Sequence, residues 1–102
     1  MSMKTTIDEL DNKYAVSLEG ELDTSAAVEV DRILKPLYKS EGKDVEIECK
    51  KLQYISSSGL RILSRILKAA KISGSVVTVK HVNDDIMNVF RLTGFGSLFN
   101  FE

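Results

Sequence analysis

The feature of this sequence that most constrains its fold is a repeated change in the spacing of its apolar residues. Five segments alternate apolar and polar side chains or form short apolar runs, which is typical of β-strands. Between them lie three segments in which apolar residues recur every three or four positions, as on the buried face of a helix. The expected strands are residues 3–9, 14–19, 44–49, 75–82 and 97–102, and the helical segments lie within residues 20–42, 50–74 and 83–94.

This order, β-β-α-β-α-β-α-β, predicts an α/β fold in which a mixed β-sheet of four to five strands has helices packed on it. Strands joined by a long helical crossover are expected to be parallel, with right-handed crossovers. Parallel strands share a carboxyl edge, and the loops leaving that edge carry the segments GELD, YISSSG and HVND. We therefore expect Asp23, Ser57 and Asn83 to lie towards one edge of the sheet.

Local signals mark where the three helices begin and end. Pro36 lacks a backbone donor, so it should kink or tighten the last turn of the first helix. Short polar residues favour helix starts and glycines favour helix ends. The expected signals are Asp23, Thr24 or Ser25 before the first helix, Gly74 after the second, and Asn83 and Gly94 around the third.

Composition narrows the classes of protein that fit. The 102 residues are expected to form a single domain, 1–102, and the net charge of -1 lacks the basic field of a general nucleic-acid binder. One cysteine, Cys49, and one histidine, His81, leave no disulfide pair and no Cys/His zinc cluster. The N-terminus lacks a secretory signal, and no window approaches the roughly 18 apolar residues of a membrane span. We expect a cytoplasmic protein without direct membrane contact.

Three consecutive serines, Ser56 to Ser58, stand where an apolar strand stops and an apolar helix starts. A serine at this position can cap the helix, which stabilises it by about 1 kcal/mol, but capping accounts for only one hydroxyl. The amino end of a helix also accepts negative charge, so a phosphate there would be tolerated by the fold. Gly59 is expected to let a partner's backbone or a phosphate donor approach closely. The stretch therefore predicts either a cap or a phosphorylation switch.

The other polar candidates favour binding or structure over catalysis. The serines have no histidine partner in the sequence pattern, and no glycine-rich phosphate cradle occurs, so we expect no enzyme and no cofactor. Cys49 is expected to be buried and His81 to be structural or exposed. Lys50 and Lys51 are expected to be solvated loop charges. Arg61, together with Arg65 one turn later, either contacts a partner's acidic face or simply lies on an exposed helix face.

Three segments of the sequence, in the same order, resemble the STAS domain family. They are GELD after the second strand, VEIECKKLQYISSSGLR through the third strand into the helix, and VFRLTGFGSLF near the end. Together they extend over nearly the whole chain, and the family includes bacterial anti-sigma-factor antagonists. The resemblance therefore implies the STAS fold and a role in a partner-switching pathway that regulates transcription.

The resemblance also implies a phosphorylation site. In family members of this type, a serine of an Asp-Ser-Ser-Gly or Ser-Ser-Ala-Gly stretch accepts phosphate, and matching SSSG to this pattern places Ser57 at the acceptor position. Ser56 stands where aspartate is common, so Ser56 and Ser58 remain alternatives. The implied partners are an anti-sigma factor with serine-kinase activity and a phosphoserine phosphatase. The implied partner-binding residues are Asp23, Thr24, Ser56, Ser58, Gly59, Leu60 and Arg61.

Two further alternatives stay open at the level of sequence. The chain could be a constitutive, unphosphorylated STAS subunit of an ABC-type lipid transporter or another regulatory complex, docked through the surface near Asp23 and Ser57. The sequence also stops at Glu102, where many relatives continue into a C-terminal helix. One face of the sheet is therefore expected to be less covered, or to be covered by a second copy in a homodimer. The aromatic residues of positions 95–101 would then be core contacts or part of that dimer surface.

Overall fold

The computed structural model describes residues 3–39 and 42–102, and its elements follow the expected order with one additional strand. The described residues form six strands in a mixed sheet, one more than the upper limit expected from the sequence. The strands are β1 Lys4–Glu9, β2 Lys13–Leu22, β3 Asp44–Glu48, β4 Leu52–Ile55, β5 Val77–Lys80 and β6 Asn100–Phe101. The helices are α1 Thr24–Leu34, α2 Ser57–Ser73 and α3 Asp84–Leu92, with short 3₁₀ turns η1 Lys35–Tyr38 and η2 Phe95–Ser97.

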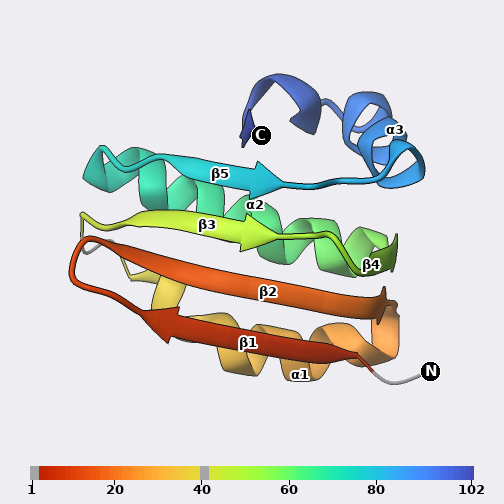
Figure 1. Ribbon diagram of the computed structural model, residues 1–102, viewed down its shortest axis with the longest axis horizontal. Helices are drawn as coiled ribbons and strands as arrows, with labels where there is room; N and C mark the ends of the chain where they lie inside the picture. The colour runs from red at the N-terminus through yellow and green to blue at the C-terminus, as the bar shows by residue number, and fades with distance from the viewer. Residues whose placement is uncertain (1–2, 40–41) are drawn as a thin grey trace.

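The sheet has the order β1-β2-β3-β5-β6, as Figure 1 shows. Only β1 and β2 run antiparallel; β2, β3, β5 and β6 pair in parallel, as expected for strands joined by helical crossovers. The carboxyl ends of the parallel strands therefore meet at one edge. In Figure 1 both α1 and α2 start at this edge, and α3 begins there after β5.

The additional strand, β4, lies between the third expected strand and the second helix, in a segment for which no separate strand was predicted. β2 pairs first with β3 and then, beyond a register shift at Gly20, with β4. The turn at Lys50 and Lys51 separates the two partners, and the Gly20 amide donates to the Lys51 carbonyl at 2.9 Å. Gly20 has a φ of 105°, which only glycine adopts readily. β4 has only four residues and follows a turn, so its alternation is too short to detect in the sequence.

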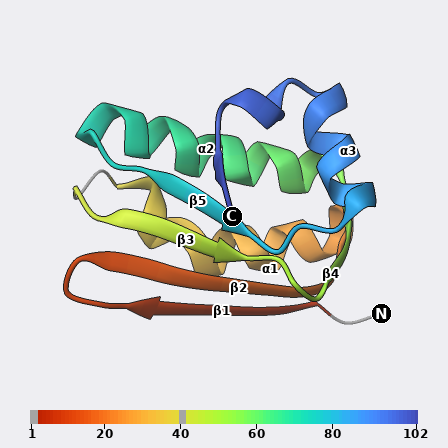
Figure 2. The same ribbon diagram turned by 45° about the horizontal axis from the view of Figure 1, so that its top comes forward.

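One face of the sheet packs on the helices and the other is open and polar (Figure 2). Along β2, Val16 and Leu18 are buried, while their neighbours Ala15, Ser17 and Glu19 lie on the open face and are half-buried. Ion pairs cross the open face: the Glu46 carboxylate of β3 contacts the Lys13 amine at 2.8 Å and the Lys80 amine at 3.5 Å. The lysine contacts lower the pKa of the Glu46 carboxyl, with the Lys13 hydrogen bond as the main cause.

The helix starts use the side chains that the sequence predicted. Asp23, Ser56 and Asn83 each accept a hydrogen bond from the amide three residues later, at 2.8, 3.2 and 2.8 Å. Gly74 ends α2 in the left-handed conformation, with a φ of 77°. Pro36 stands near the start of η1, so the expected tightening after the first helix is confirmed. Within the described ranges, every helix is too short or too polar to cross a membrane.

The C-terminal aromatic residues mostly close the core. Phe90 of α3 is fully buried, with its ring centroid 5.8 Å from both Phe99 and Phe101. Phe95 stacks on Phe99 at the same centroid distance. Leu98 is the apolar residue of this group that remains exposed, at 43% of its surface. Core contacts therefore explain the aromatic residues, while the homodimer expected from the sequence stays a prediction.

Gly59 is required by packing at the start of α2, which leads to a stability prediction. A Cβ at this position would lie 2.7 Å from Leu22 Cγ and 2.9 Å from Ile55 Cγ1, both on buried side chains. We expect Gly59→Ala to lower the free energy of unfolding by about 1–3 kcal/mol in urea denaturation, despite the better helix propensity of alanine. Gly96→Ala is the matched control, because its Cβ would make only ordinary contacts with Arg91. Equal stability of both variants would contradict this account.

Substitutions of the serines at the start of α2 should differ in their effect on the free energy of unfolding, measured by the same urea denaturation. Ser56→Ala removes the cap hydrogen bond to the Gly59 amide, so we expect a loss of about 1 kcal/mol. Ser57→Ala removes an exposed hydroxyl and should change the free energy of unfolding by less than about 0.5 kcal/mol. A larger loss in Ser57→Ala than in Ser56→Ala would show that the capping residue has been assigned to the wrong serine.

Candidate functional site

The candidate site lies at the sheet edge where α1 and α2 begin. The Ser56 amide donates to the Leu22 carbonyl at 2.8 Å, which joins the end of β4 to the end of β2. Asp23, the next residue after β2, is thereby held beside the serine stretch, as the topology predicted. Its carboxylate accepts the Ala26 amide, so it caps α1 while remaining half-buried.

The three serines have three different environments. Ser56 is buried, with 8% of its surface exposed, and its hydroxyl accepts the Gly59 amide. Ser57 is the first residue of α2 and is exposed. Ser58 is half-buried and lines a groove between α1 and α2. The three consecutive serines therefore have different roles: Ser56 caps the helix, Ser57 is exposed to solvent and Ser58 lines the groove.

Ser57 is the exposed serine of the three. Among the described residues, no hydrogen-bond partner for its hydroxyl is found. The first turn of α2, which is described throughout, contains no acidic residue. The free amides and the positive end of the helix dipole at this position therefore favour an anion and meet no local negative charge within the helix.

Three of the residues expected at a partner-binding surface are buried, so the expectation that they lie on the accessible surface is corrected. Ser56, Gly59 and Leu60 are all buried, because the inner face of α2 packs on the sheet. The missing Cβ of Gly59 accommodates Leu22 and Ile55 and not an approaching partner. These residues shape the site from beneath, and the accessible surface comes from their neighbours.

The accessible residues form a shallow groove between α1 and α2 with a volume of about 290 Å³. Thr24 and Arg61, two of the predicted contact residues, line it together with Ser58. Val28, also in the groove, is 75% exposed, and sequence reasoning missed it. The sequence could have indicated its exposure, because Val28 lies outside the buried helical stripe of Ala27, Val30 and Leu34. Tyr54 in β4, 51% exposed, was missed because β4 itself was not predicted.

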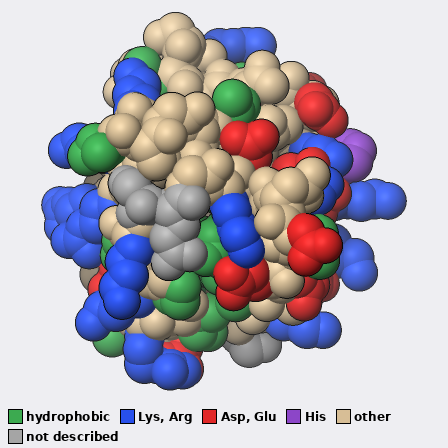
Figure 3. Space-filling view, turned by 90° about the vertical axis from the view of Figure 1, so that its left-hand side faces the viewer, with side chains coloured by type: hydrophobic (Ala, Val, Ile, Leu, Met, Phe, Trp, Pro, Cys, Tyr) green, Lys and Arg blue, Asp and Glu red, His purple; other side chains and the backbone are tan. Residues whose placement is uncertain are grey.

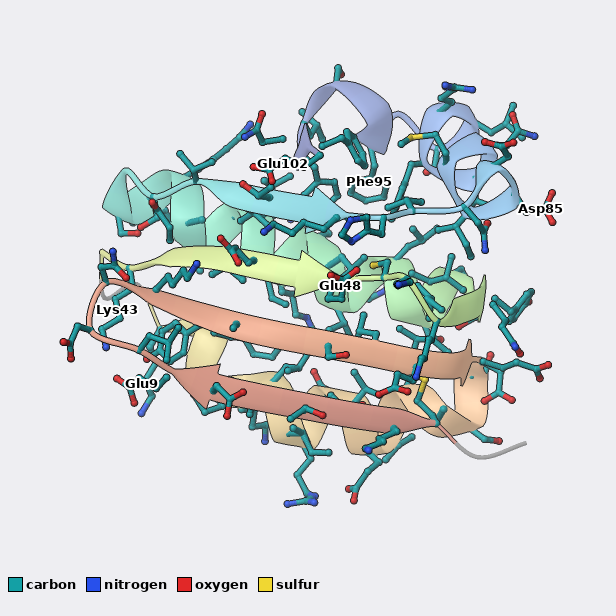
Figure 4. The ribbon with its side chains drawn as sticks, viewed as in Figure 1. Glu9, Lys43, Glu48, Asp85, Phe95 and Glu102 are labelled. Carbon is teal, nitrogen blue, oxygen red and sulfur yellow. The ribbon has the colours of Figure 1, made fainter. Side chains whose placement is uncertain are left out.

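Asn83 reaches the same edge but not the serines. Its side-chain amide donates to the Leu52 carbonyl at 3.1 Å, so α3 is tied to the beginning of β4. Asp85, in the first turn of α3, points away from the sheet in Figure 4. The three loops thus end at the same edge of the sheet, as predicted. Only the loops that carry Asp23 and the serines are joined directly, by the Ser56–Leu22 hydrogen bond.

The remaining polar candidates lie away from the serines or are closed to solvent. Cys49 is fully buried, and burial raises the pKa of its thiol to about 12, with the Glu48 carboxylate adding to the effect. His81 is exposed and its Nδ1 lies 2.8 Å from a Glu48 oxygen, a carboxylate neighbour that the sequence did not reveal (Figure 4). Lys50 and Lys51 are exposed turn residues, as predicted.

The described part of the chain contains no group of three or more His, Cys, Asp or Glu side chains placed to hold a metal ion. At the opposite end of the sheet the charged contacts are structural: the Lys43 amine donates to the Glu9 carboxylate at 2.8 Å and to the Leu10 carbonyl at 2.9 Å (Figure 4). The Lys43 hydrogen bond lowers the pKa of the Glu9 carboxyl.

Comparison with known proteins agrees with the fold. The sequence model of the family described as "Mlab, STAS domain" matches residues 5–100, almost the entire chain. The anti-sigma-B factor antagonist of Staphylococcus aureus is 28% identical over 98 residues, which are 96% of this chain and 89% of that protein.

Solved structures show the same architecture at lower sequence identity. An anti-sigma-factor antagonist (STAS) domain protein from Planctomyces limnophilus superposes with a TM-score of 0.82 at 13% identity, covering 95% of this chain and 87% of that one. The Bacillus cell fate determinant SpoIIAA in its phosphorylated form gives 0.74 at 15% identity, covering 97% and 91%. The extent of the family match and the shared fold lead to one conclusion: this chain belongs to the STAS domain family.

Proposed function

We propose that this protein is a bacterial anti-sigma-factor antagonist that binds an anti-sigma-factor serine kinase and is switched by phosphorylation of Ser57. The observation that carries the proposal is the state of the Ser57 hydroxyl. It is exposed at the first position of α2 and has no hydrogen-bond partner among the described residues, while Ser56 performs the capping. A kinase can therefore reach this hydroxyl without disturbing the scaffold.

The position of Ser57 explains how phosphorylation would act as a switch. A phosphoserine adds about -1.5 to -2 charges, which free amides and the helix dipole at the start of α2 accommodate. The cap of α2 belongs to Ser56 and the cap of α1 to Asp23, so neither needs to change. Phosphorylation would thus alter the outer surface around Thr24 and Arg61 while leaving the fold intact.

The same geometry favours Ser57 over its two alternatives. A phosphate on Ser56 would replace the hydroxyl that accepts the Gly59 amide and would place charge at a position that is only 8% exposed. Ser58 lines the groove and is half-buried, so a kinase would have to enter between α1 and α2 to reach it. Ser57 requires neither rearrangement.

The comparisons support the function at the level of protein class. The Staphylococcus aureus relative is an anti-sigma-B factor antagonist and is similar over nearly the full length of both chains. One structural neighbour, SpoIIAA, exists in a phosphorylated form within the same fold. A phosphatase that removes the phosphate would complete the cycle in this protein.

A second function is compatible with membership in the STAS domain family. In that case the chain would be a constitutive small subunit of an ABC-type lipid transporter, and Ser57 would contact an ATPase subunit without being modified. The two functions differ in whether an ATP-dependent change of mass occurs at Ser57 and in whether docking persists afterwards.

Incubation with ATP and an anti-sigma-factor kinase from the same organism should add one phosphate, detected by intact mass and mapped by peptide fragmentation. We expect Ser57→Ala to abolish the addition and Ser58→Ala to retain it, because Ser58 is only half-buried groove lining. The wild-type reaction is the positive control. Addition of phosphate to Ser57→Ala at the wild-type rate would show that Ser57 is not the acceptor. Copurification of this protein with a transporter ATPase and not with a kinase would favour the second function.

Ser57→Asp should weaken kinase binding while the protein stays folded. A carboxylate at the start of α2 introduces part of the charge of a phosphate at a position where the helix tolerates it. We expect at least a tenfold increase in Kd by titration calorimetry and an unfolding midpoint close to that of the wild type. Ser97→Asp, an exposed site in η2, adds the same charge elsewhere and serves as the control. Undiminished binding of Ser57→Asp would be incompatible with an electrostatic switch.

A further inference from the structure

Positive charge is concentrated on the helical layer although the whole chain carries a net charge of -1. The helices that cover the sheet, α1, η1 and α2, contain six basic residues and two acidic ones, so the acidic excess lies elsewhere. Figure 3 looks at the molecule from the left-hand side of Figure 1 and shows Lys and Arg on both sides, with Asp and Glu mainly on the side of the sheet. The basic residues are Arg32, Lys35, Arg61, Arg65, Lys68 and Lys71, and the acidic ones are Glu29 and Asp31.

Both acidic residues of this layer are already paired. Glu29 contacts Arg32 at 2.6 Å within α1. Asp31 accepts the Tyr38 hydroxyl at 2.6 Å and the Arg65 guanidinium at 3.1 Å, which links α1, η1 and α2. Burial and the neighbouring Asp31 carboxylate raise the pKa of the Tyr38 hydroxyl, so it remains a donor to Asp31 at neutral pH. Arg65 is therefore committed to a structural contact.

Arg61 is the basic residue closest in sequence to Ser57, and it is available for a new ion pair. It is exposed, and it takes part in none of the ion pairs found among the described residues. It follows Ser57 by four positions in a continuous helix and lines the groove with Ser58. Side chains four positions apart lie one above the other on the same face of a helix.

The acidic groups near this end form no ion pair with Arg61 among the described residues. Asp23 accepts the Ala26 amide and caps α1. Glu21, at the end of β2, likewise takes part in none of the ion pairs found there. Asp31 is held by Tyr38 and Arg65. A new anion at position 57 would therefore find Arg61 as the nearest unpaired cation along its own helix.

We propose that Arg61 is the positioning residue that pairs, within the same chain, with a phosphate on Ser57. The proposal rests on the proposed function because it concerns the phosphorylated form of the same serine. A guanidinium matches phosphate oxygens with two parallel donors, so it fixes the orientation of the phosphate as well as its charge. The phosphate is then held against α2 and does not project freely into solvent.

This pairing gives the switch a second component. In the unmodified protein Arg61 is free to contact an acidic surface of the partner, in keeping with the basic character of the whole helical layer. After phosphorylation the same guanidinium is occupied by its own phosphate. The partner would thus lose an attractive cation at the moment it meets a new negative charge, and the docking surface of the partner is expected to be acidic.

The experiment installs phosphoserine at position 57 of the full chain by genetic code expansion, so no kinase is needed. Phosphorus NMR then follows the second ionisation of the phosphate, which lies near pH 6 in free phosphoserine. We expect this pKa to be lower in the wild-type background than in Arg61→Gln by about 0.15 to 0.4, as for an exposed pair four positions apart. Arg61→Lys should retain part of the difference, and Lys68→Gln, farther along the same helix, should match the wild type.

Two results would overturn the proposal. Equal phosphate pKa values in the wild type and Arg61→Gln would show that no pair forms. Equal changes in Arg61→Gln and Lys68→Gln would show a general effect of the basic layer in place of a specific contact. Because the phosphate is installed synthetically, a pair observed here together with a failed kinase reaction would reject the proposed function alone. Phosphorylation by the kinase without the pair would reject only the role of Arg61.

Discussion

The site depends on the close contact between Gly59 and the ends of β2 and β4. With no Cβ, the backbone of α2 lies against Leu22 and Ile55, and the Ser56 amide bonds to the Leu22 carbonyl. This junction fixes where α2 begins and how its first turn is oriented. The exposed position of Ser57 follows from the burial of its neighbours, because successive helical residues point about 100° apart around the axis.

A rigid junction of this kind suits a protein that is recognised by others. Capping and packing are assigned to Ser56 and Gly59, so the exposed serine carries no structural duty that modification would disturb. The chain belongs to the STAS domain family and is similar to anti-sigma factor antagonists over nearly its whole length. The groove between α1 and α2, with Val28 and Arg61, extends that surface beyond the serine.

The distribution of charge shows why overall composition says little about such a surface. A net charge of -1 suggests an even mixture, yet the helical layer is basic and its two acids are paired internally. The open face of the sheet instead carries alternating contacts such as those of Glu46 with Lys13 and Lys80. A partner approaching the helices would therefore experience a positive field that the net charge conceals.

The sequence by itself determined the order of the elements, the helix caps and the position of the serine stretch at the carboxyl edge. These features depend on local periodicity and on residues a few positions apart, such as Asp23 with Ala26 and Asn83 with Ile86. Tertiary structure alone decided that β4 pairs with β2, that Gly59 faces the core and that Asp31 occupies Arg65 but leaves Arg61 free. Each of these depends on contacts between segments distant in the chain, whose distance and direction no local pattern of residues specifies.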